Sequence, residues 1–207
     1  MQTIFSTSDV EPRYRFDYWH SIACQRIINH DSVPVHRDDF RADLKCGTLG
    51  EIEFVQFENS PMSVTHRLDH VSDADAGFLY ICRQAVGRLS LQQNGQSVVL
   101  GSGDLVLLEP RLPYTASFAD DSSMLVAKIP RALMTDHLRN YRPLIGHAIR
   151  RASAEVAMTS TFMATLPNHV DRLGPAASQL ASDYLLKMFA LSTLVGGREP
   201  LPNPPTL

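Results

Sequence analysis

The chain has 207 residues and a mass of 23.0 kDa, which corresponds to one domain or slightly more. Hydrophobic residues make up 44% and charged residues 20%, as in an average globular protein, so wholesale disorder is excluded. The net charge of −3 lacks the basic excess of autonomous nucleic-acid binders. Apolar runs such as residues 105–108 are too short to cross a bilayer, and residues 1–6 lack the features of a signal peptide. We therefore expect a cytoplasmic protein with no membrane partner.

Three cysteines, Cys24, Cys46 and Cys82, are widely spaced and form no CxxC motif. Their odd number argues against a disulfide framework, and their spacing argues against a structural zinc site. We expect free thiols, as is usual inside cells.

The first predicted element is a helix over residues 13–28. Asp9 and Pro12 suit its start, and Trp19 belongs to a set of apolar side chains at helical spacing. Trp19 is the only tryptophan, and we expect it to dock this helix onto the main body.

Residues 40–129 have the character of short strands broken by turns. Leucine alternates with polar residues over 89–92, as in a half-buried strand, and Asn94-Gly95 is a strong signal for a two-residue hairpin turn. Further strands are expected at residues 51–58, 62–68, 78–86, 98–100, 105–108, 114–118 and 124–129. Many short strands at this spacing predict a barrel or a sandwich.

After Pro130 the apolar pattern becomes helical, with predicted helices over residues 131–140, 159–172 and 175–195. Gly196-Gly197 suits the end of the last helix. Residues 198–207 include four prolines and are expected to form a linker or tail.

Four turn signals follow predicted strands in a fixed order. They are Gly87-Arg88, Asn94-Gly95, Gly101-Ser102-Gly103-Asp104 and Pro113-Tyr114, flanked by Phe5-Ser6-Thr7 and Tyr18-Trp19 before them and Ile129-Pro130-Arg131-Ala132-Leu133 after them. This order resembles the small cupin barrel that forms the sensing domain of AraC/XylS-type transcriptional regulators. The resemblance spans residues 4 to 195.

The resemblance implies an α+β, mainly β fold: a cupin-like (double-stranded β-helix) barrel with an N-terminal helix and a C-terminal helical dimerisation segment. The implied boundaries are residues 1–37 for the N-terminal helix, 38–130 for the barrel, 131–195 for the dimerisation segment and 196–207 for the tail. Such regulators usually continue into two helix-turn-helix motifs, and this chain ends where that half would begin. Contact with DNA is therefore expected only through a domain that these residues do not contain.

Many cupins are metal enzymes, so their ligand positions test for catalysis. If Gly87 closes the first cupin motif, its two histidine positions fall on Ala74 and Ala76, and its glutamate position falls on Tyr80. The histidine position of the second motif falls on Tyr114. These residues do not supply the imidazole and carboxylate set that a divalent metal needs. We expect no stoichiometric transition metal in the purified chain, no cofactor and no catalysis.

His66 and His70 are also unsuited to a metal, because on a strand they would lie about 13 Å apart. The alternative to a sensing domain is a stand-alone cupin enzyme, an isomerase or a dioxygenase, with an unusual site.

Counting positions along the same two cupin motifs places Tyr80 and Tyr114 where metal cupins point their ligands into the barrel. Strand alternation sends Phe78 and Cys82 to the side of Tyr80, and His66 can face inward from a neighbouring strand. An apolar cavity with a few polar groups suits a small organic effector. The predicted ligand-binding residues are Tyr80, Cys82, Tyr114, His66 and Phe78.

The last predicted helix is apolar over more than one narrow stripe. A helix packed on a barrel needs only one apolar face. The additional apolar residues of this helix therefore predict contact with a second partner. The resemblance and this pattern together predict a homodimer through Leu180, Tyr184, Leu185, Met188, Leu191 and Leu194. The sequence thus predicts an effector-sensing, dimerising domain of an AraC/XylS-like regulator.

Overall fold

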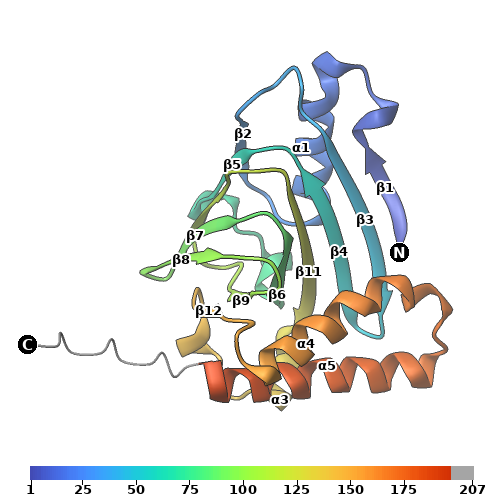
Figure 1. The fold of residues 1–207 in the computed structure, drawn as a ribbon, viewed down its shortest axis with the longest axis vertical. Helices are drawn as coiled ribbons and strands as arrows, with labels where there is room; N and C mark the ends of the chain where they lie inside the picture. Colours follow the sequence, from blue (N-terminus) through green and yellow to red (C-terminus); the bar gives the residue numbers. More distant parts are fainter. Residues whose placement is uncertain (197–207) are drawn as a thin grey trace, which may run out of the picture.

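The computed structural model describes residues 1–196, and the predicted tail from residue 197 onward lies outside the described residues. Two antiparallel sheets face each other (Figure 1). The larger sheet has seven strands in the order β1-β3-β4-β11-β6-β9-β12, and the smaller has five in the order β2-β5-β10-β7-β8. The strands are β1 (Gln2–Ser6), β2 (Asp31–Pro34), β3 (Ala42–Leu49), β4 (Ile52–Asn59), β5 (Met62–His66), β6 (Phe78–Val86), β7 (Leu89–Gln93), β8 (Gln96–Leu100), β9 (Leu105–Leu108), β10 (Tyr114–Phe118), β11 (Ser122–Pro130) and β12 (Ala148–Ile149). The α-helices are α1 (Arg15–Arg26), α2 (Asp73–Ala76), α3 (Arg131–His137), α4 (Ala154–Thr165) and α5 (Pro175–Gly196).

The larger sheet is buried on both faces. Along β6, Tyr80 and Cys82 belong to the core between the two sheets, whereas Leu79 and Ile81 belong to a second core on the outer face. Because side chains alternate along a strand, one strand serves both cores. This explains the uninterrupted apolar residues of β9, which sequence alternation alone would not predict.

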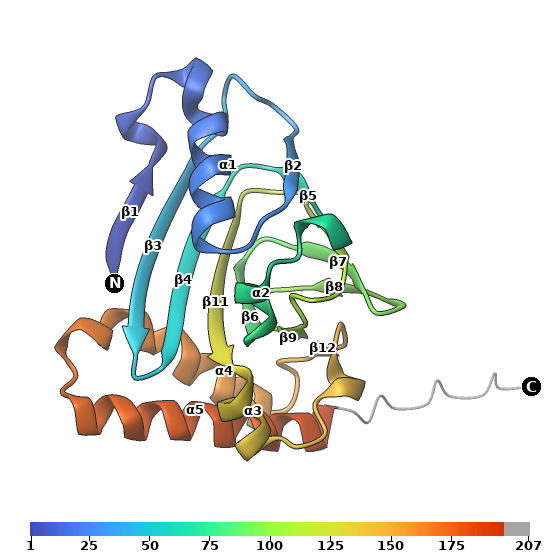
Figure 2. The ribbon, with the colours of Figure 1, turned by 180° about the vertical axis from the view of Figure 1, so that it is seen from behind.

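The inner core is closed by α1, which packs beside the long strands (Figure 2). Trp19 is 1% exposed, and its ring meets Phe40 edge-on with centroids 5.4 Å apart. Phe16 meets the same phenylalanine at 5.2 Å. The expectation that Trp19 docks this helix onto the main body is therefore confirmed.

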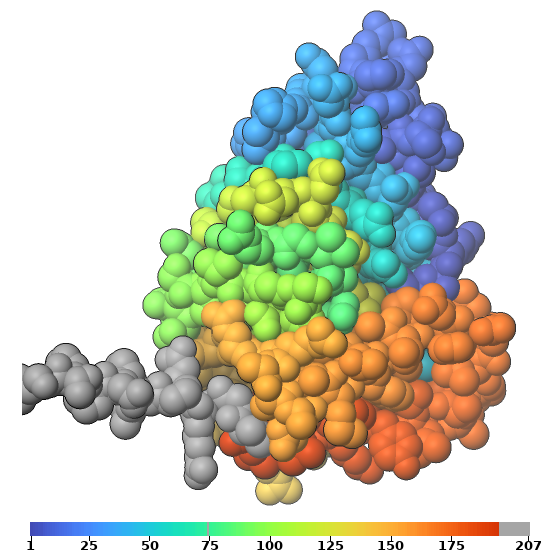
Figure 3. All heavy atoms as spheres, viewed as in Figure 1, coloured from blue at the N-terminus to red at the C-terminus, as the bar shows by residue number. Residues whose placement is uncertain are grey.

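The outer core lies under α3, α4 and α5, which form one end of the molecule in the space-filling view (Figure 3). Leu185, Leu186 and Phe189 of α5 are buried in it. The fold class predicted from the sequence is confirmed: a cupin-like, two-sheet fold with an N-terminal helix and C-terminal helices.

The β7–β8 hairpin confirms the turn signal at Asn94-Gly95. Both residues have positive φ, 54° and 74°, which the two-residue turn between twisted strands requires. Asparagine and glycine are the residues that tolerate this conformation best.

Several boundaries differ from the sequence prediction. The helix predicted over 159–172 is α4, which begins earlier because the Ser153 hydroxyl caps it, and a 3₁₀ turn containing Pro167 follows its end. Ala74 and Ala76, which occupy the cupin histidine positions, lie in α2, a short helix that the sequence did not predict. Residues 1–37 also contribute strands that the sequence did not predict, since β1 pairs with β3 and β2 pairs with β5.

Candidate functional site: an interior cavity and a histidine–cysteine cluster

A cavity of about 60 Å³ lies between the two sheets. The larger sheet contributes Tyr80 and Cys82, the smaller sheet contributes Leu91 and Tyr114, and α1 contributes Trp19. The other lining side chains are almost all aliphatic or aromatic. The site is therefore an apolar chamber with a small number of polar atoms in its wall.

Two of the lining residues each carry a buried polar atom without a partner. Trp19 Nε1 and His30 Nε2 are buried, and neither finds a hydrogen bond within residues 1–196. His30 Nδ1 donates to the carbonyl of Ile28 at 2.7 Å, which leaves Nε2 as an acceptor. Burial lowers the pKa of His30 to about 4, so the ring is neutral near pH 7. The cavity residues thus hold one unused donor and one unused acceptor, each costing about 1–3 kcal/mol while unpaired.

Both predicted tyrosines reach the cavity but differ in their surroundings. The Tyr80 hydroxyl donates to the carbonyl of Ile27 at 3.0 Å, so it fastens the segment after α1. The Tyr114 ring stacks on His66 with centroids 5.2 Å apart. Burial raises the pKa of both hydroxyls far above neutrality, so both are uncharged.

Cys82 also lines the cavity, and burial raises the pKa of its thiol to about 12. A thiol nucleophile needs a lowered pKa, so Cys82 is a packing residue here. The structure brings together three of the predicted ligand-binding residues: Tyr80, Cys82 and Tyr114.

The other two predicted residues lie outside the cavity lining. His66 is buried with Nδ1 2.6 Å from the Asn29 carbonyl and Nε2 2.9 Å from the Pro110 carbonyl, so backbone groups occupy both nitrogens. Phe78 is half-buried and lines a separate surface hollow. The expected 13 Å between His66 and His70 is wrong: the rings are 5.9 Å apart because the chain turns into a 3₁₀ helix after the strand.

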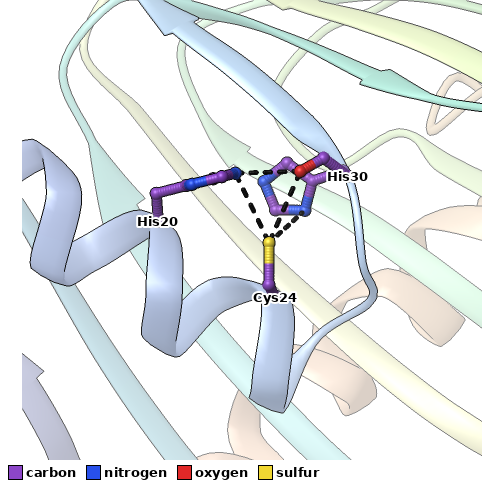
Figure 4. A group of neighbouring side chains, drawn as sticks. All are labelled: His20, Cys24 and His30. Atoms are coloured by element: carbon purple, nitrogen blue, oxygen red, sulfur yellow. Dashed lines mark hydrogen bonds between the residues drawn. The ribbon is translucent and has the colours of Figure 1, made fainter. Parts of the chain in front are cut away.

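A cluster that the sequence analysis missed lies at the end of α1 (Figure 4). His20, Cys24 and His30 place one potential ligand atom each within 4.8 Å of the others. His20 and Cys24 are four residues apart and so share a face of the helix, which is a readable signal. His30 comes from the segment that follows, and no local pattern predicts that it folds back.

The predicted dimer residues on α5 divide into two groups. Leu185 is completely buried in the outer core of its own chain, so it cannot belong to a free surface. Met188 is half-buried. The exposed members, each more than half accessible, are Leu180, Tyr184, Leu191 and Leu194.

Comparison with known proteins decides the family. A family model described as the AraC-binding-like domain matches residues 19–195. The chain belongs to the AraC-binding-like domain family. The resemblance drawn from the order of the turns is thereby confirmed.

Two similar proteins show how far this likeness extends. One, from Bacillus sp. (strain OxB-1), is described as "Uncharacterized protein in nit 5'region"; it is 24% identical over 95% of this chain and 77% of its own length. The crystal structure of the AraC-like transcriptional activator CuxR superimposes with a TM-score of 0.79 at 16% identity, covering 92% of this chain and 69% of CuxR. At this identity the match to CuxR concerns the fold. Within residues 1–196, no helix of this AraC-binding-like domain has the length and hydropathy to span a membrane.

Proposed function

We propose that this AraC-binding-like domain senses a small organic effector and dimerises as part of an AraC-like transcription regulator, without catalysing a reaction. In this proposal residues 38–130 form the sensing barrel and residues 131–195 the dimerisation segment. DNA contact is assigned to a helix-turn-helix domain outside these 207 residues. Family membership supports the regulatory role. The observation that carries effector binding is the apolar cavity between the sheets, two of whose lining residues, Trp19 and His30, carry an unpaired buried polar atom.

The size of the cavity restricts how an effector binds. A cavity of about 150 Å³ is known to bind benzene, and 60 Å³ is well below that. An effector larger than a few atoms must therefore displace part of the wall. Trp19, Ile27 and His30 form the part that lies outside the strands. We propose that this segment moves when the effector enters.

The unpaired atoms define the chemistry of the proposed effector. It is a compact, mostly apolar molecule with one acceptor for the Trp19 N–H and one donor for His30 Nε2. A ligand that completes both hydrogen bonds removes two unsatisfied buried groups at once. This matching discriminates against purely hydrocarbon molecules of the same shape.

The experiment is a thermal-shift screen of small metabolites, because a ligand that binds the native state raises the unfolding temperature. Quenching or shift of the fluorescence of Trp19, the single tryptophan, then shows whether a hit enters this cavity. Hits that stabilise the protein but leave the emission unchanged bind elsewhere.

Calorimetry with variants tests the assigned atoms. Trp19→Phe keeps an aromatic ring but removes the donor, and we expect binding to weaken by about 0.5–1.5 kcal/mol. Tyr114→Phe is expected to weaken binding by a similar amount if the effector also reaches that hydroxyl. Tyr18→Phe, on the exposed side of α1, is the control. Wild-type affinity in both cavity variants would contradict the assignment.

A further inference from the structure

We propose that His20, Cys24 and His30 form a binding site for a divalent first-row metal ion, with Zn²⁺ as the ion that suits the donor set best. Two imidazoles and one thiolate are borderline-soft ligands of the kind zinc prefers. The site lies at the C-terminal end of α1, and its ligand His30 also lines the cavity that Tyr80 and Tyr114 line. The proposal departs from the expectation of a chain without a bound transition metal, which rested on the residues Ala74, Ala76, Tyr80 and Tyr114 at the cupin ligand positions.

The spacing of the ligand atoms already approaches that of a tetrahedral centre. Zinc–sulfur and zinc–nitrogen bonds of about 2.3 and 2.0–2.1 Å put tetrahedral sulfur and nitrogen ligands about 3.6 Å apart. Cys24 Sγ lies 3.4 Å from His20 Nε2 and 3.8 Å from His30 Nδ1. The two measured distances bracket the expected value, and all three ligand atoms lie within 4.8 Å of one another. Small side-chain rotations are enough to complete the geometry.

In the metal-free protein these atoms are held by backbone carbonyls. The carbonyl of His30 lies 2.8 Å from His20 Nε2 and accepts from the Cys24 thiol at 3.4 Å, while His30 Nδ1 donates to Ile28. A metal ion replaces these contacts. Ligation at Nδ1 moves the ring proton of His30 to Nε2, which has no competing partner within the described residues, so in the metal-bound form this atom donates to an effector instead of accepting from it.

Access also favours a cation. Cys24 is half-buried and lines a surface hollow of about 220 Å³ together with Asp75, which gives an ion a route to the thiol. Three protein ligands leave the fourth position to water from this hollow.

The test is titration of the purified, reduced chain with Co²⁺, a spectroscopic substitute for Zn²⁺. We expect one ion per chain, a near-ultraviolet thiolate-to-cobalt charge-transfer band and the strong visible bands of a four-coordinate centre. Zn²⁺ should bleach these bands and raise the unfolding temperature. Absence of the thiolate band with saturating Co²⁺ would overturn the proposal. The cluster would then only join α1 to the following segment through hydrogen bonds.

Matched variants identify the ligands. Cys24→Ser should abolish the charge-transfer band, and His20→Gln should weaken Co²⁺ binding by more than about tenfold, the least that even an outer-shell partner contributes. Cys46→Ser is the control, because Cys46 is also a half-buried thiol with a pKa raised by burial but lies outside the cluster. A band that survives Cys24→Ser, or that disappears in Cys46→Ser, would refute the site.

Discussion

At the scale of single residues, the burial of His30 makes stability depend on pH. Its pKa is about 4 in the folded protein and about 6.5 in an unfolded chain, so between these values the unfolded chain binds a proton that the folded chain does not. The free energy of unfolding should therefore fall as the pH drops from 6.5 to 4, by up to about 3 kcal/mol from this residue. Urea unfolding across this range measures the slope.

Two histidine variants separate His30 from the other titrating groups. His30→Gln removes the titrating ring and should flatten the slope, whereas His36→Gln, at an exposed position, should leave it unchanged. An unchanged slope in His30→Gln would show that other groups cause the acid sensitivity.

Arg131 is a second residue whose environment permits a prediction. Its guanidinium binds both carboxylate oxygens of Glu109, at 2.7 and 2.8 Å, and also Tyr141 at 2.7 Å. The Glu109 side chain is 9% exposed, so Arg131→Met leaves its carboxylate largely buried without its charged partner. We expect a loss of about 3–5 kcal/mol in the free energy of unfolding, measured in urea. Arg13→Met breaks an exposed pair with Glu11 and should change stability by less than about 1 kcal/mol. Equal effects of the two substitutions would contradict this account.

At the scale of secondary-structure elements, α4 depends on the residue that caps its N-terminus, Ser153. The Ser153 hydroxyl accepts from the Val156 N–H at 3.2 Å and so satisfies one of the free N–H groups of the first turn. Ser153→Ala should lower the free energy of unfolding by about 1 kcal/mol, as thermal or urea unfolding would show. Ser153→Asp retains a capping oxygen and should restore most of the loss. If both variants are equally unstable, the cap is not the cause.

At the scale of the whole molecule, α5 presents an apolar stripe to solvent while its opposite face fills the outer core. Leu180, Tyr184 and Leu191 lie along this stripe, and exposed apolar patches commonly mark protein contacts. We expect wild-type protein to be a dimer and Leu191→Glu to be a monomer, because dimerisation would bury the new carboxylate. Light scattering on protein eluting from a sizing column measures the mass.

Val99→Glu is the matched control for this prediction. Val99 on β8 is 50% exposed, against 52% for Leu191, so both substitutions introduce the same charge at equal exposure. Val99→Glu should remain dimeric. A dimer that persists in Leu191→Glu, or dissociates in Val99→Glu, would place the interface elsewhere.

The sequence by itself determined the features that depend on neighbouring residues. Asn94-Gly95 specifies its turn because few residues tolerate positive φ, and the alternation along β6 predicts that Tyr80 and Cys82 face the same side. The order of such local signals along the chain was also enough to indicate the family. Each of these properties depends on backbone geometry over a few residues.

The tertiary structure decided which residues from distant segments meet. His30 lies beside His20 and Cys24 because the chain reverses after α1, and Leu185 is buried because the outer face of the larger sheet selects one side of α5. The hydrogen bonds of His66 join it to Asn29, 37 residues away, which no spacing rule predicts. Such contacts follow from packing two sheets and their helices into one volume, and the sequence encodes that packing only through all of its residues together.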